Sequence, residues 1–483
     1  RHGVYLGRDV QMIPHVTGDV KRRLRELAVR GDGERPADVV IVEVGGTAGD
    51  YENSFYIEAM RELAFEEGPG SACLVALTYV IEPNTLGEQK SKAAQLGIKR
   101  LMEAGIQPHI IACRATNPVG ASVQEKIAMF SNVPMRRVFS MHDRPSVYAI
   151  PEEMRAEGLD REILGVLDLH DRVNASKEDR ARVRWGEFVD RLHGPRDRSL
   201  TIGIAGKYTG LRDAYASIDK AIEHCSTQLR TDIQLEWIET SEITPKNVGK
   251  ARGSLDAVIV PGGFGSRGIE GKIECVRYCR EQHVPLLGIC LGFQVAVIEF
   301  ARNVLRIDDA TSTEFEPDTL NALISELPDQ KRIEGLGGTM RLGAQDVVLQ
   351  EDTLASFLFG GAPTVRERFR HRYEVEPTAI ERLEAHGLIF SGRHPSQPIM
   401  QILELAQPDP EASEEEQPAK ITHPYFVAAQ FHPELTSRPL RPQPVFMGLV
   451  AAALSRRFGS ELLDAEPDIA SWVRRQARSP RSI

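Results

Sequence analysis

The chain has 483 residues and a formal net charge of −10, with 41% apolar and 27% charged residues. This length exceeds one ordinary domain, so we expect about two to four domains. The acidic balance argues against bulk nucleic-acid binding, and the apolar runs are too short to cross a bilayer. Six cysteines without paired spacing favour a reducing compartment, and we therefore expect a cytoplasmic protein.

The first 165 residues alternate short β-rich runs with amphipathic helical stretches. This pattern predicts buried parallel strands at 39–44, 73–80, 109–113 and 137–141. We expect a doubly wound, mainly parallel α/β sheet. Charged and glycine residues at 43–50 follow the first of these runs, where open α/β sheets bind ligands.

Residues 166–198 lose the strand pattern and predict a helical linker. Ser176 with Asp179 predicts the start of a helix, and Gly194-Pro195 predicts its end. Its apolar stripe is Trp185, Phe188, Val189 and Leu192. A second α/β domain is expected over 199–460, with a charged inserted loop at 407–420 and a basic tail at 461–483.

Within the second domain, Gly288-Ile289-Cys290-Leu291-Gly292 follows an apolar run at 284–289. Flanking glycines around one nucleophile are typical of a sharp strand-to-helix turn that exposes the side chain. A thiol nucleophile needs a base and a group that orients the base, and His432 and Glu434 lie two residues apart. His432 alone would more often be structural, but with the elbow upstream the set predicts a catalytic triad.

An acyl-transfer site also needs backbone N–H donors for the oxyanion. Residues 260–265 read Val-Pro-Gly-Gly-Phe-Gly and predict such a loop, although a Gly-Gly pair alone is usually just a turn. Cys275 and Cys279 lie four residues apart without a matching second pair, so burial is favoured over metal binding.

The motifs Pro-Gly-Gly-Phe-Gly, Gly-Ile-Cys-Leu-Gly-Phe-Gln and Gln-Phe-His-Pro-Glu together resemble the class I (triad) glutamine amidotransferases, which hydrolyse glutamine through a glutamyl thioester. The segments 312–315, 337–343 and 370–375 are more specifically similar to the CTP synthase family, and this likeness runs over nearly the whole chain. It implies that 337–343 is a lid through which GTP activates the enzyme. The glutamine ligands that it implies are Gly263, Leu291, Gly292, Phe293, Gln294, Glu314 and Arg372. Glu314 suits the ammonium group of an amino acid and Arg372 suits its carboxylate. Without the elbow, surface ion pairs would be the favoured interpretation of these two residues.

The same resemblance implies an ATP-dependent amination of UTP to CTP, with CTP as feedback inhibitor. It implies a P-loop-like amidoligase domain, a homotetramer and filaments. Glu43 matches the magnesium ligand, and His142, Asp143 and Arg144 match the ATP site. The UTP and CTP site would comprise Asp50, Tyr51, Glu52, Lys90, Ser91, Lys92, Gln95 and Lys126.

Two departures from the family pattern stand out. The family's Lys-Thr-Lys-Pro-Thr-Gln reads Lys-Ser-Lys-Ala-Ala-Gln at 90–95, so one hydroxyl and a proline are lost, each at about 1 kcal/mol of UTP binding. No phosphate loop of the form G-x-x-x-x-G-K-[ST] occurs, so an N-terminally truncated amidoligase domain over 1–165 is expected. One interpretation is that the chain retains only the glutaminase half. A stand-alone glutaminase subunit and a nucleotide-binding assembly scaffold remain as alternatives.

Overall fold

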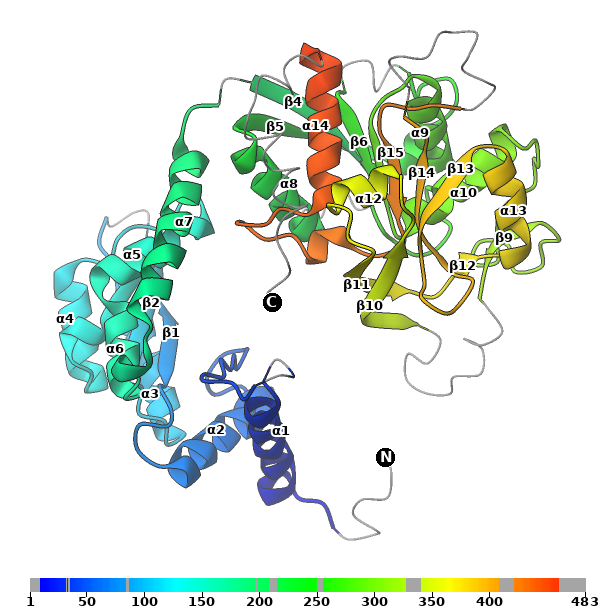
Figure 1. Ribbon diagram of the computed structural model, residues 1–483. Helices are drawn as coiled ribbons and strands as arrows, with labels where there is room; N and C mark the ends of the chain where they lie inside the picture. The colour runs from blue at the N-terminus through cyan, green and yellow to red at the C-terminus, as the bar shows by residue number, and fades with distance from the viewer. Residues whose placement is uncertain are drawn as a thin grey trace. The chain divides into compact units, whose positions relative to one another are not determined.

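The computed structural model describes residues 9–31, 33, 35–83, 87–196, 198–207, 215–249, 255–326, 340–407 and 421–459 (Figure 1). The chain divides into two compact units, Arg1–Gly186 and Glu187–Ile483. Most of the predicted inserted loop, the tail and residues 337–339 of the predicted lid lie outside the described residues. In the described parts of the chain, no helix is long and apolar enough to span a membrane.

The first unit contains a parallel three-stranded sheet in the order β1-β2-β3. Its strands are β1 (Val75–Tyr79), β2 (Ile110–Ala115) and β3 (Val138–His142), so three of the four predicted strands are confirmed. Helices α3 (Lys92–Glu103) and α4 (Ala121–Ser131) pack together on one face, where Ile98, Ile111 and Ile127 share a core. Burial on the sheet explains why the strand segments read as nearly continuous apolar runs.

The fourth predicted strand, at 39–44, is wrong. These residues have no regular structure, and the side chains of Val39, Ile41 and Val42 are 52%, 93% and 42% exposed. A parallel strand is stable only when a neighbouring strand accepts its hydrogen bonds, and the structure places no described strand beside this segment. The apolar run alone therefore predicted a pairing that the described residues do not make, and Glu43 does not end a strand.

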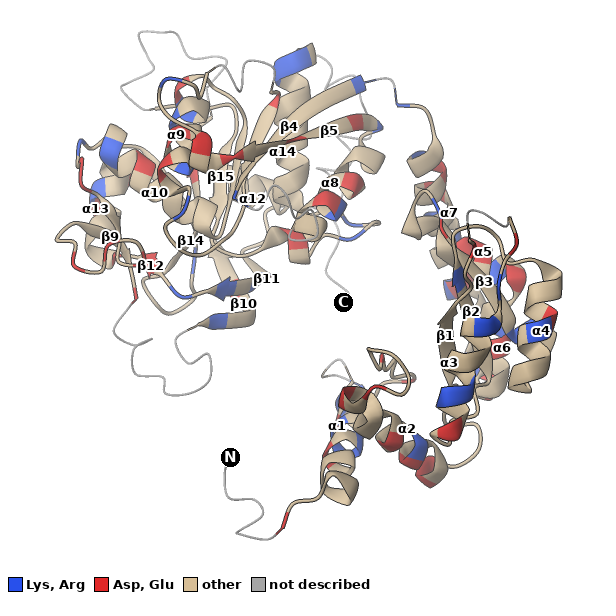
Figure 2. Ribbon diagram, turned by 180° about the vertical axis from the view of Figure 1, so that it is seen from behind, with Lys and Arg blue, Asp and Glu red and all other residues tan. Residues whose placement is uncertain are grey.

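Helices α1 (Thr17–Arg30) and α2 (Ser54–Glu67) pack against each other and are joined by ion pairs. The buried Lys21 Nζ lies 2.6 Å from Glu62 Oε2 and 2.5 Å from Glu66 Oε1. Figure 2 shows acidic and basic residues interspersed along both helices. Ion pairs between the two helices therefore add to their packing contacts.

The remaining helices of this unit are α5 (Ile150–Glu157), α6 (Leu159–Val166) and the first part of α7 (Ala175–His193), whose residues from Glu187 onward belong to the second unit. The short helical turns are η1 (Met12–Val16), η2 (Tyr51–Asn53), η3 (Met135–Arg137), η4 (Val147–Ala149) and η5 (His170–Arg172). Helix α7 ends at His193, just before the Gly-Pro pair as predicted. Its start differs from the prediction, because Asn174 caps it: the Lys177 N–H donates to Asn174 Oδ1 at 3.0 Å. An Asn side chain serves this role as well as Ser.

The second unit is built on a nine-stranded sheet in the order β11-β10-β13-β14-β15-β7-β6-β4-β5. The five strands from β15 to β5 run parallel, and β11, β10, β13 and β14 extend the sheet in antiparallel pairings. The strands are β4 (Arg198–Gly206), β5 (Thr231–Glu239), β6 (Ala257–Val260), β7 (Leu286–Ile289), β10 (Arg341–Leu349), β11 (Thr364–His371), β13 (Leu388–Arg393), β14 (Met400–Leu405) and β15 (Phe426–Ala429). A second, small sheet has the strand order β12-β9-β8, with β8 (Thr311–Ser312), β9 (Ala322–Ser325) and β12 (Glu374–Val375).

Helices cover both faces of this sheet, as a doubly wound fold requires (Figure 1). Leu287 and Ile289 of β7 face the core under α8 and α14, whereas Leu286 faces the core under α9 and α10. The helices are α8 (Ala216–Gln228), α9 (Ile269–Glu281), α10 (Leu291–Asn303), α12 (Leu354–Leu358), α13 (Pro377–Ala385) and α14 (Pro444–Phe458), with turns η7 (Thr240–Glu242) and η8 (Pro433–Leu435).

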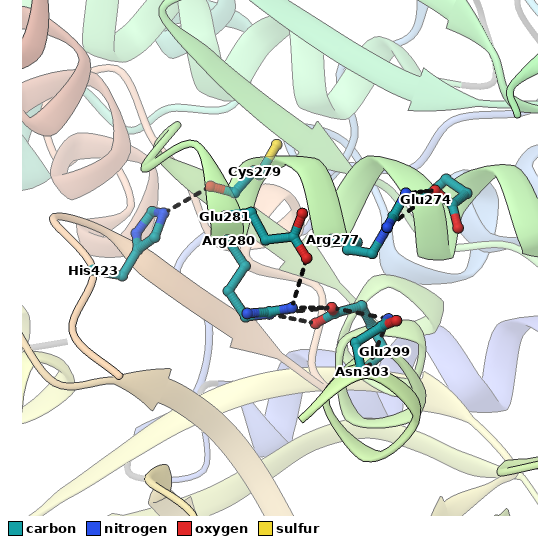
Figure 3. Close-up of polar contacts among 8 residues, drawn as sticks. All are labelled: Glu274, Arg277, Cys279, Arg280, Glu281, Glu299, Asn303 and His423. Atoms are coloured by element: carbon teal, nitrogen blue, oxygen red, sulfur yellow. Dashed lines mark hydrogen bonds and ion pairs between the residues drawn. The ribbon is translucent and has the colours of Figure 1, made fainter. Parts of the chain in front are cut away.

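A buried ion pair joins α9 to α10 (Figure 3). Arg280 Nε donates to both carboxylate oxygens of Glu299 at 3.1 Å, and the Glu299 side chain is fully buried. On the other side of α9, His423 Nε2 lies 3.0 Å from the Cys279 carbonyl oxygen. Cys275 and Cys279 themselves are buried in the apolar core. These contacts fix the helix pair whose second member begins directly after Cys290.

Candidate active site

Cys290 lies at the junction of β7 and α10 with φ 52° and ψ −100°. A non-glycine residue with this backbone is strained, and such strain is typical of a nucleophile elbow. The flanking glycines are required by close approach: a Cβ on Gly292 would lie 2.1 Å from the Val260 carbonyl oxygen, and one on Gly288 would lie 2.8 Å from Ala428 Cβ. The sharp turn therefore requires glycine on both sides of Cys290.

The predicted base and its orienting carboxylate follow β15, the strand next to β7 in the sheet. His432 Nδ1 lies 2.7 Å from Glu434 Oε1, and both side chains are largely buried. Burial alone would lower the pKa of His432, but the Cys290 thiol and Glu434 outweigh it and raise the pKa to about 10. Nε2 is left without a well-directed hydrogen bond to any described residue. The imidazole is thus held by one nitrogen and available through the other.

The predicted oxyanion loop passes beside the elbow. A Cβ on Gly262 would lie 3.1 Å from His432 Cε1 and 3.5 Å from Cys290 Cβ, and one on Gly263 would lie 3.4 Å from Leu291 Cδ2. The loop, the thiol and the imidazole therefore meet at the carboxyl ends of β6, β7 and β15, which is where parallel α/β sheets place reacting groups.

Glu314 and Arg372, predicted to hold a zwitterion, lie near each other and near this loop. Glu314 Oε1 accepts a hydrogen bond from the Gly265 N–H at 2.7 Å. Burial raises the pKa of Glu314, while the Gly265 N–H, Lys207 and Arg372 act in the opposite direction. Arg372 Nε lies 3.5 Å from Glu326 Oε1 and is partly exposed. One acidic and one basic group thus stand beside the predicted oxyanion loop.

The other predicted glutamine ligands belong to the first turn of α10. Gln294 is buried, and its Nε2 donates to the Tyr373 carbonyl at 3.1 Å. Phe293 is fully buried in the core with its ring 6.5 Å from that of Phe390, so it can offer a ligand only its backbone. Gly292 and Leu291 contribute the N-terminus of the helix, whose free N–H groups favour negative charge.

Sequence reasoning missed Gln430, which lies in the same Gln-Phe-His-Pro-Glu motif as the predicted base. The side chain is fully buried, and its Nε2 donates to Cys290 Sγ at 3.8 Å. Its Oε1 accepts from Gln294 Nε2 at 3.3 Å. A buried amide one residue beyond β15 is the signal that could have identified it, because a buried polar side chain needs partners.

In the first unit, a cavity of about 420 Å³ brings together Glu43, Asp50 and Glu52. Asn53 also lines it, and its Nδ2 donates to the carbonyl oxygens of Gly45 and Thr47 at 3.1 and 2.9 Å. Tyr51 between the two acids is 82% exposed. The structure thus gathers the predicted metal ligand with two of the predicted pyrimidine-nucleotide residues.

The predicted ATP residues line a second cavity of about 380 Å³ at the carboxyl end of β3. Asp143 Oδ1 accepts from Arg114 Nη2 at 2.6 Å, Arg144 pairs with Glu153, and His142 Nδ1 lies 2.9 Å from Ser140 Oγ. These residues lie together, but they share no lining residue with the first cavity.

The remaining predicted nucleotide residues lie at the start of α3 and on α4. Lys90 Nζ lies 2.6 Å from Glu88 Oε2, and Lys126 lowers the pKa of Glu88 together with Lys90. Ser91 precedes α3 and accepts a hydrogen bond from Gln95 Nε2 at 3.0 Å, while Lys92 is the first residue of the helix. The structure therefore brings Lys90 and Lys126 to the same acidic side chain.

Two protein families match two different parts of the chain. A family described as "CTP synthase N-terminus" matches residues 1–169, and one described as "Glutamine amidotransferase class-I" matches residues 211–452. The second match and the thiol site define an amidotransferase of the triad class. The first match adds a synthase domain, so the alternative of a stand-alone glutaminase subunit is wrong.

The chain belongs to the CTP synthase family, whose members are glutamine-hydrolysing ligases. It is 43% identical over 460 residues to the CTP synthase of Thermococcus gammatolerans, a match that spans 95% of this chain and 81% of that protein. It is 44% identical over 454 residues to the CTP synthase of Haloarcula hispanica, spanning 94% and 77%. A solved glutaminase domain of Trypanosoma brucei CTPS with bound acivicin is 31% identical, with a TM-score of 0.46, covering 53% of this chain and 94% of that one.

Proposed function

We propose that glutamine is hydrolysed at Cys290, His432 and Glu434, and that the ammonia aminates UTP in the first unit. The observation that carries the proposal is the strained Cys290 beside a buried imidazole whose Nδ1 is held by a carboxylate at 2.7 Å. This arrangement joins a nucleophile, a base and an orienting group, as a covalent acyl-transfer mechanism requires.

In this mechanism the Cys290 thiol passes its proton to His432 Nε2 before substrate is attacked, because the pKa of His432 is raised to about 10. The resulting thiolate Sγ attacks the side-chain amide carbon of glutamine. The oxyanion is stabilised by backbone N–H groups of the Gly262–Gly263 loop and the start of α10. His432 gives its proton to the departing nitrogen, which leaves as ammonia and forms a glutamyl thioester. Water, deprotonated by His432, then cleaves the thioester to glutamate and regenerates the thiol.

The glutamine substrate would be held by its own charges. Glu314 pairs with the α-ammonium group and Arg372 with the α-carboxylate, while Gly263, Leu291 and Gln294 surround the side chain. Gln430 adds a donor to the sulfur, since its amide already faces Sγ. Charge-assisted bonds at both ends of an amino acid favour a free zwitterion over a peptide.

In the first unit we propose that ATP phosphorylates O4 of UTP and ammonia displaces the phosphate. Asp50, Glu52, Lys90, Lys92, Gln95 and Lys126 would bind UTP or the product CTP, together with Tyr51 and Ser91, and His142, Asp143 and Arg144 would bind ATP. Glu43 would be the Mg²⁺ ligand, since hard cations prefer oxygen ligands and Glu43 shares a cavity with Asp50 and Glu52. The described residues hold no group of three acidic, histidine or cysteine side chains close enough to bind a metal ion by themselves, so phosphate oxygens would have to complete the site. A bound Mg²⁺ would neutralise phosphate charge.

Three further points complete the proposal. We propose that GTP activates glutamine hydrolysis through the 337–343 segment, that CTP inhibits by feedback, and that the chain assembles as a homotetramer capable of forming filaments. Residues 166–198 would link the amidoligase domain (1–165) to the amidotransferase domain (199–460). A cytoplasmic location is supported by the cysteines, whose spacing shows no disulfide pattern.

Replacing Cys290 by Ala tests the proposal. We expect the variant to lose glutaminase activity by about 10³-fold or more, since it has no nucleophile. CTP formation from added ammonia should persist at the level of the unmodified chain. The matched control is Cys73→Ala, which removes a thiol from the first unit and should leave glutamine hydrolysis unchanged. Glutaminase activity that survives Cys290→Ala would overturn the triad assignment.

A further inference from the structure

Lys272 on α9 is one of the largest side chains that the structure buries completely, with 1% of its surface exposed. A lysine is seldom buried without a partner, because removing its charge from water is costly. Its ammonium group donates to the Pro261 carbonyl oxygen at 3.0 Å. In the described parts of the chain, no carboxylate forms an ion pair with it.

The contacted carbonyl belongs to the predicted oxyanion loop. Lys272 Nζ would lie 4.0 Å from a Cβ on Gly263, whereas a Cβ on Gly262 would lie 3.5 Å from Cys290 Cβ. The Pro261–Gly262 peptide is trans, so its carbonyl and its N–H point in opposite directions. A carbonyl held toward Lys272 therefore fixes the Gly262 N–H on the other side of the loop.

The charge on Lys272 depends on its surroundings. Burial lowers the pKa of Lys272 to about 8, with a further lowering by Lys207, while the thiols of Cys275 and Cys290 act in the opposite direction. The group is thus cationic below pH 8 and neutral above it. A cation in a low-dielectric core acts over several ångströms, so it favours negative charge that develops at the nearby sulfur and oxyanion.

We propose that Lys272 is a positioning residue of the glutaminase site, whose ammonium group holds the Pro261 carbonyl, orients the oxyanion loop and supplies positive charge beside Cys290. The inference rests on the proposed triad and adds a residue that does not touch the substrate. A charge-assisted hydrogen bond to the carbonyl also polarises the peptide, which makes the Gly262 N–H a stronger donor.

The experiment compares Lys272→Met and Lys272→Gln in the full chain. Met removes the charge and the donor at nearly constant volume, and Gln removes the charge but keeps a donor. For Lys272→Met we expect kcat for glutamine hydrolysis to fall about 10- to 100-fold, with KM changed less than about 3-fold. The reason is that the Gly262 N–H, which Lys272 orients, stabilises the transition state rather than the bound substrate. Lys272→Gln should recover several-fold of this loss.

The pH profile separates positioning from a merely structural role. In the unmodified chain kcat/KM should decline as pH rises through about 8, and both variants should lack this decline. The exposed Lys246→Met removes a lysine charge from the same unit and should leave kcat and the profile unchanged. Melting temperatures show whether each variant folds. If Lys272→Met does not fold, the proposal is tested by comparing the pH dependence of kcat/KM in Lys272→Gln with that of the unmodified chain.

An unmodified kcat in Lys272→Met, or a decline near pH 8 that persists in Lys272→Gln, would overturn the inference. Neither result would bear on the triad assignment, which the Cys290→Ala variant tests separately. Conversely, glutaminase activity in Cys290→Ala would remove the basis for the role of Lys272 whatever its own variants do.

Discussion

The two units present their sites very differently. In the second unit the thiol, the imidazole and the carboxylate lie at adjoining strand ends, and Cys290 is only 3% exposed. In the first unit the predicted nucleotide residues occupy two cavities and the start of a helix, and Tyr51 is 82% exposed. A covalent mechanism needs its groups in place before substrate arrives, whereas a nucleotide carries its own charges and can order the loops that bind it.

This comparison predicts where substitutions act. Changes in the packed frame of the second unit should alter stability and turnover. Changes among the predicted nucleotide residues of the first unit should alter ligand affinity with little effect on folding. The three predictions below test that division.

The largest effect is expected at Glu299, the buried carboxylate that joins α10 to Arg280 of α9 (Figure 3). Glu299→Gln keeps the volume but leaves the Arg280 charge without its full counter-charge in the core. We expect the free energy of unfolding of this unit to fall by about 3 to 5 kcal/mol, as for other buried pairs that lose one partner. Urea unfolding followed by tryptophan fluorescence measures it.

The matched control lies on α9, the helix that carries Arg280. Glu274 pairs with Arg277 at 2.6 Å, but one turn of helix separates them and both are partly exposed (Figure 3). Glu274→Gln should therefore cost less than about 0.5 kcal/mol. Equal losses in the two variants would show that the buried pair is not what holds α9 and α10 together.

The sequence predicted the second unit better than the first for a physical reason. The elbow and the parallel strands around it leave a direct mark on the sequence, because Gly292 must be glycine where Val260 approaches it and the buried strands must be apolar. The strand at 39–44 was predicted from apolar composition, which says nothing about whether a neighbour accepts its hydrogen bonds. Lys272 and Gln430 were missed because only tertiary packing places them near the sulfur.

A smaller effect is expected from His423, another buried group of the second unit. Its Nδ1 accepts from the Tyr425 N–H at 3.1 Å, so a proton there would break a buried hydrogen bond. Burial, with His283 and Arg280 nearby, lowers the pKa of His423 to about 4, although the hydrogen bond to the Cys279 carbonyl partly opposes this.

The direction in which pH changes stability follows from proton binding at His423 in the folded and the unfolded chain. Between about pH 6.5 and pH 4 the unfolded chain binds a proton at His423 that the folded chain excludes, so stability falls as pH decreases through this window. The loss is about 2 to 3 kcal/mol by pH 4, and His423→Gln should remove most of that slope. The exposed His386→Gln is the control; if it flattened the pH dependence of unfolding as much as His423→Gln, burial would not be the cause.

The smallest effect is expected in the first unit, at Lys126 on α4. Lys90 pairs with Glu88, and Lys126 also lowers the pKa of that carboxylate, so both cations act on one acidic side chain of the predicted phosphate site. Lys126→Met should weaken UTP binding by about 10-fold, the scale of one phosphate contact, with no change in melting temperature. Calorimetric titration with UTP measures this without requiring turnover.

The exposed Lys99→Met on α3 removes the same charge away from the predicted site and should bind UTP as the unmodified chain does. If Lys126→Met instead lowered the melting temperature and left UTP affinity intact, Lys126 would stabilise the fold rather than bind UTP. That result would contradict the proposed difference between a preformed site in the second unit and a site in the first unit that is completed by its ligand.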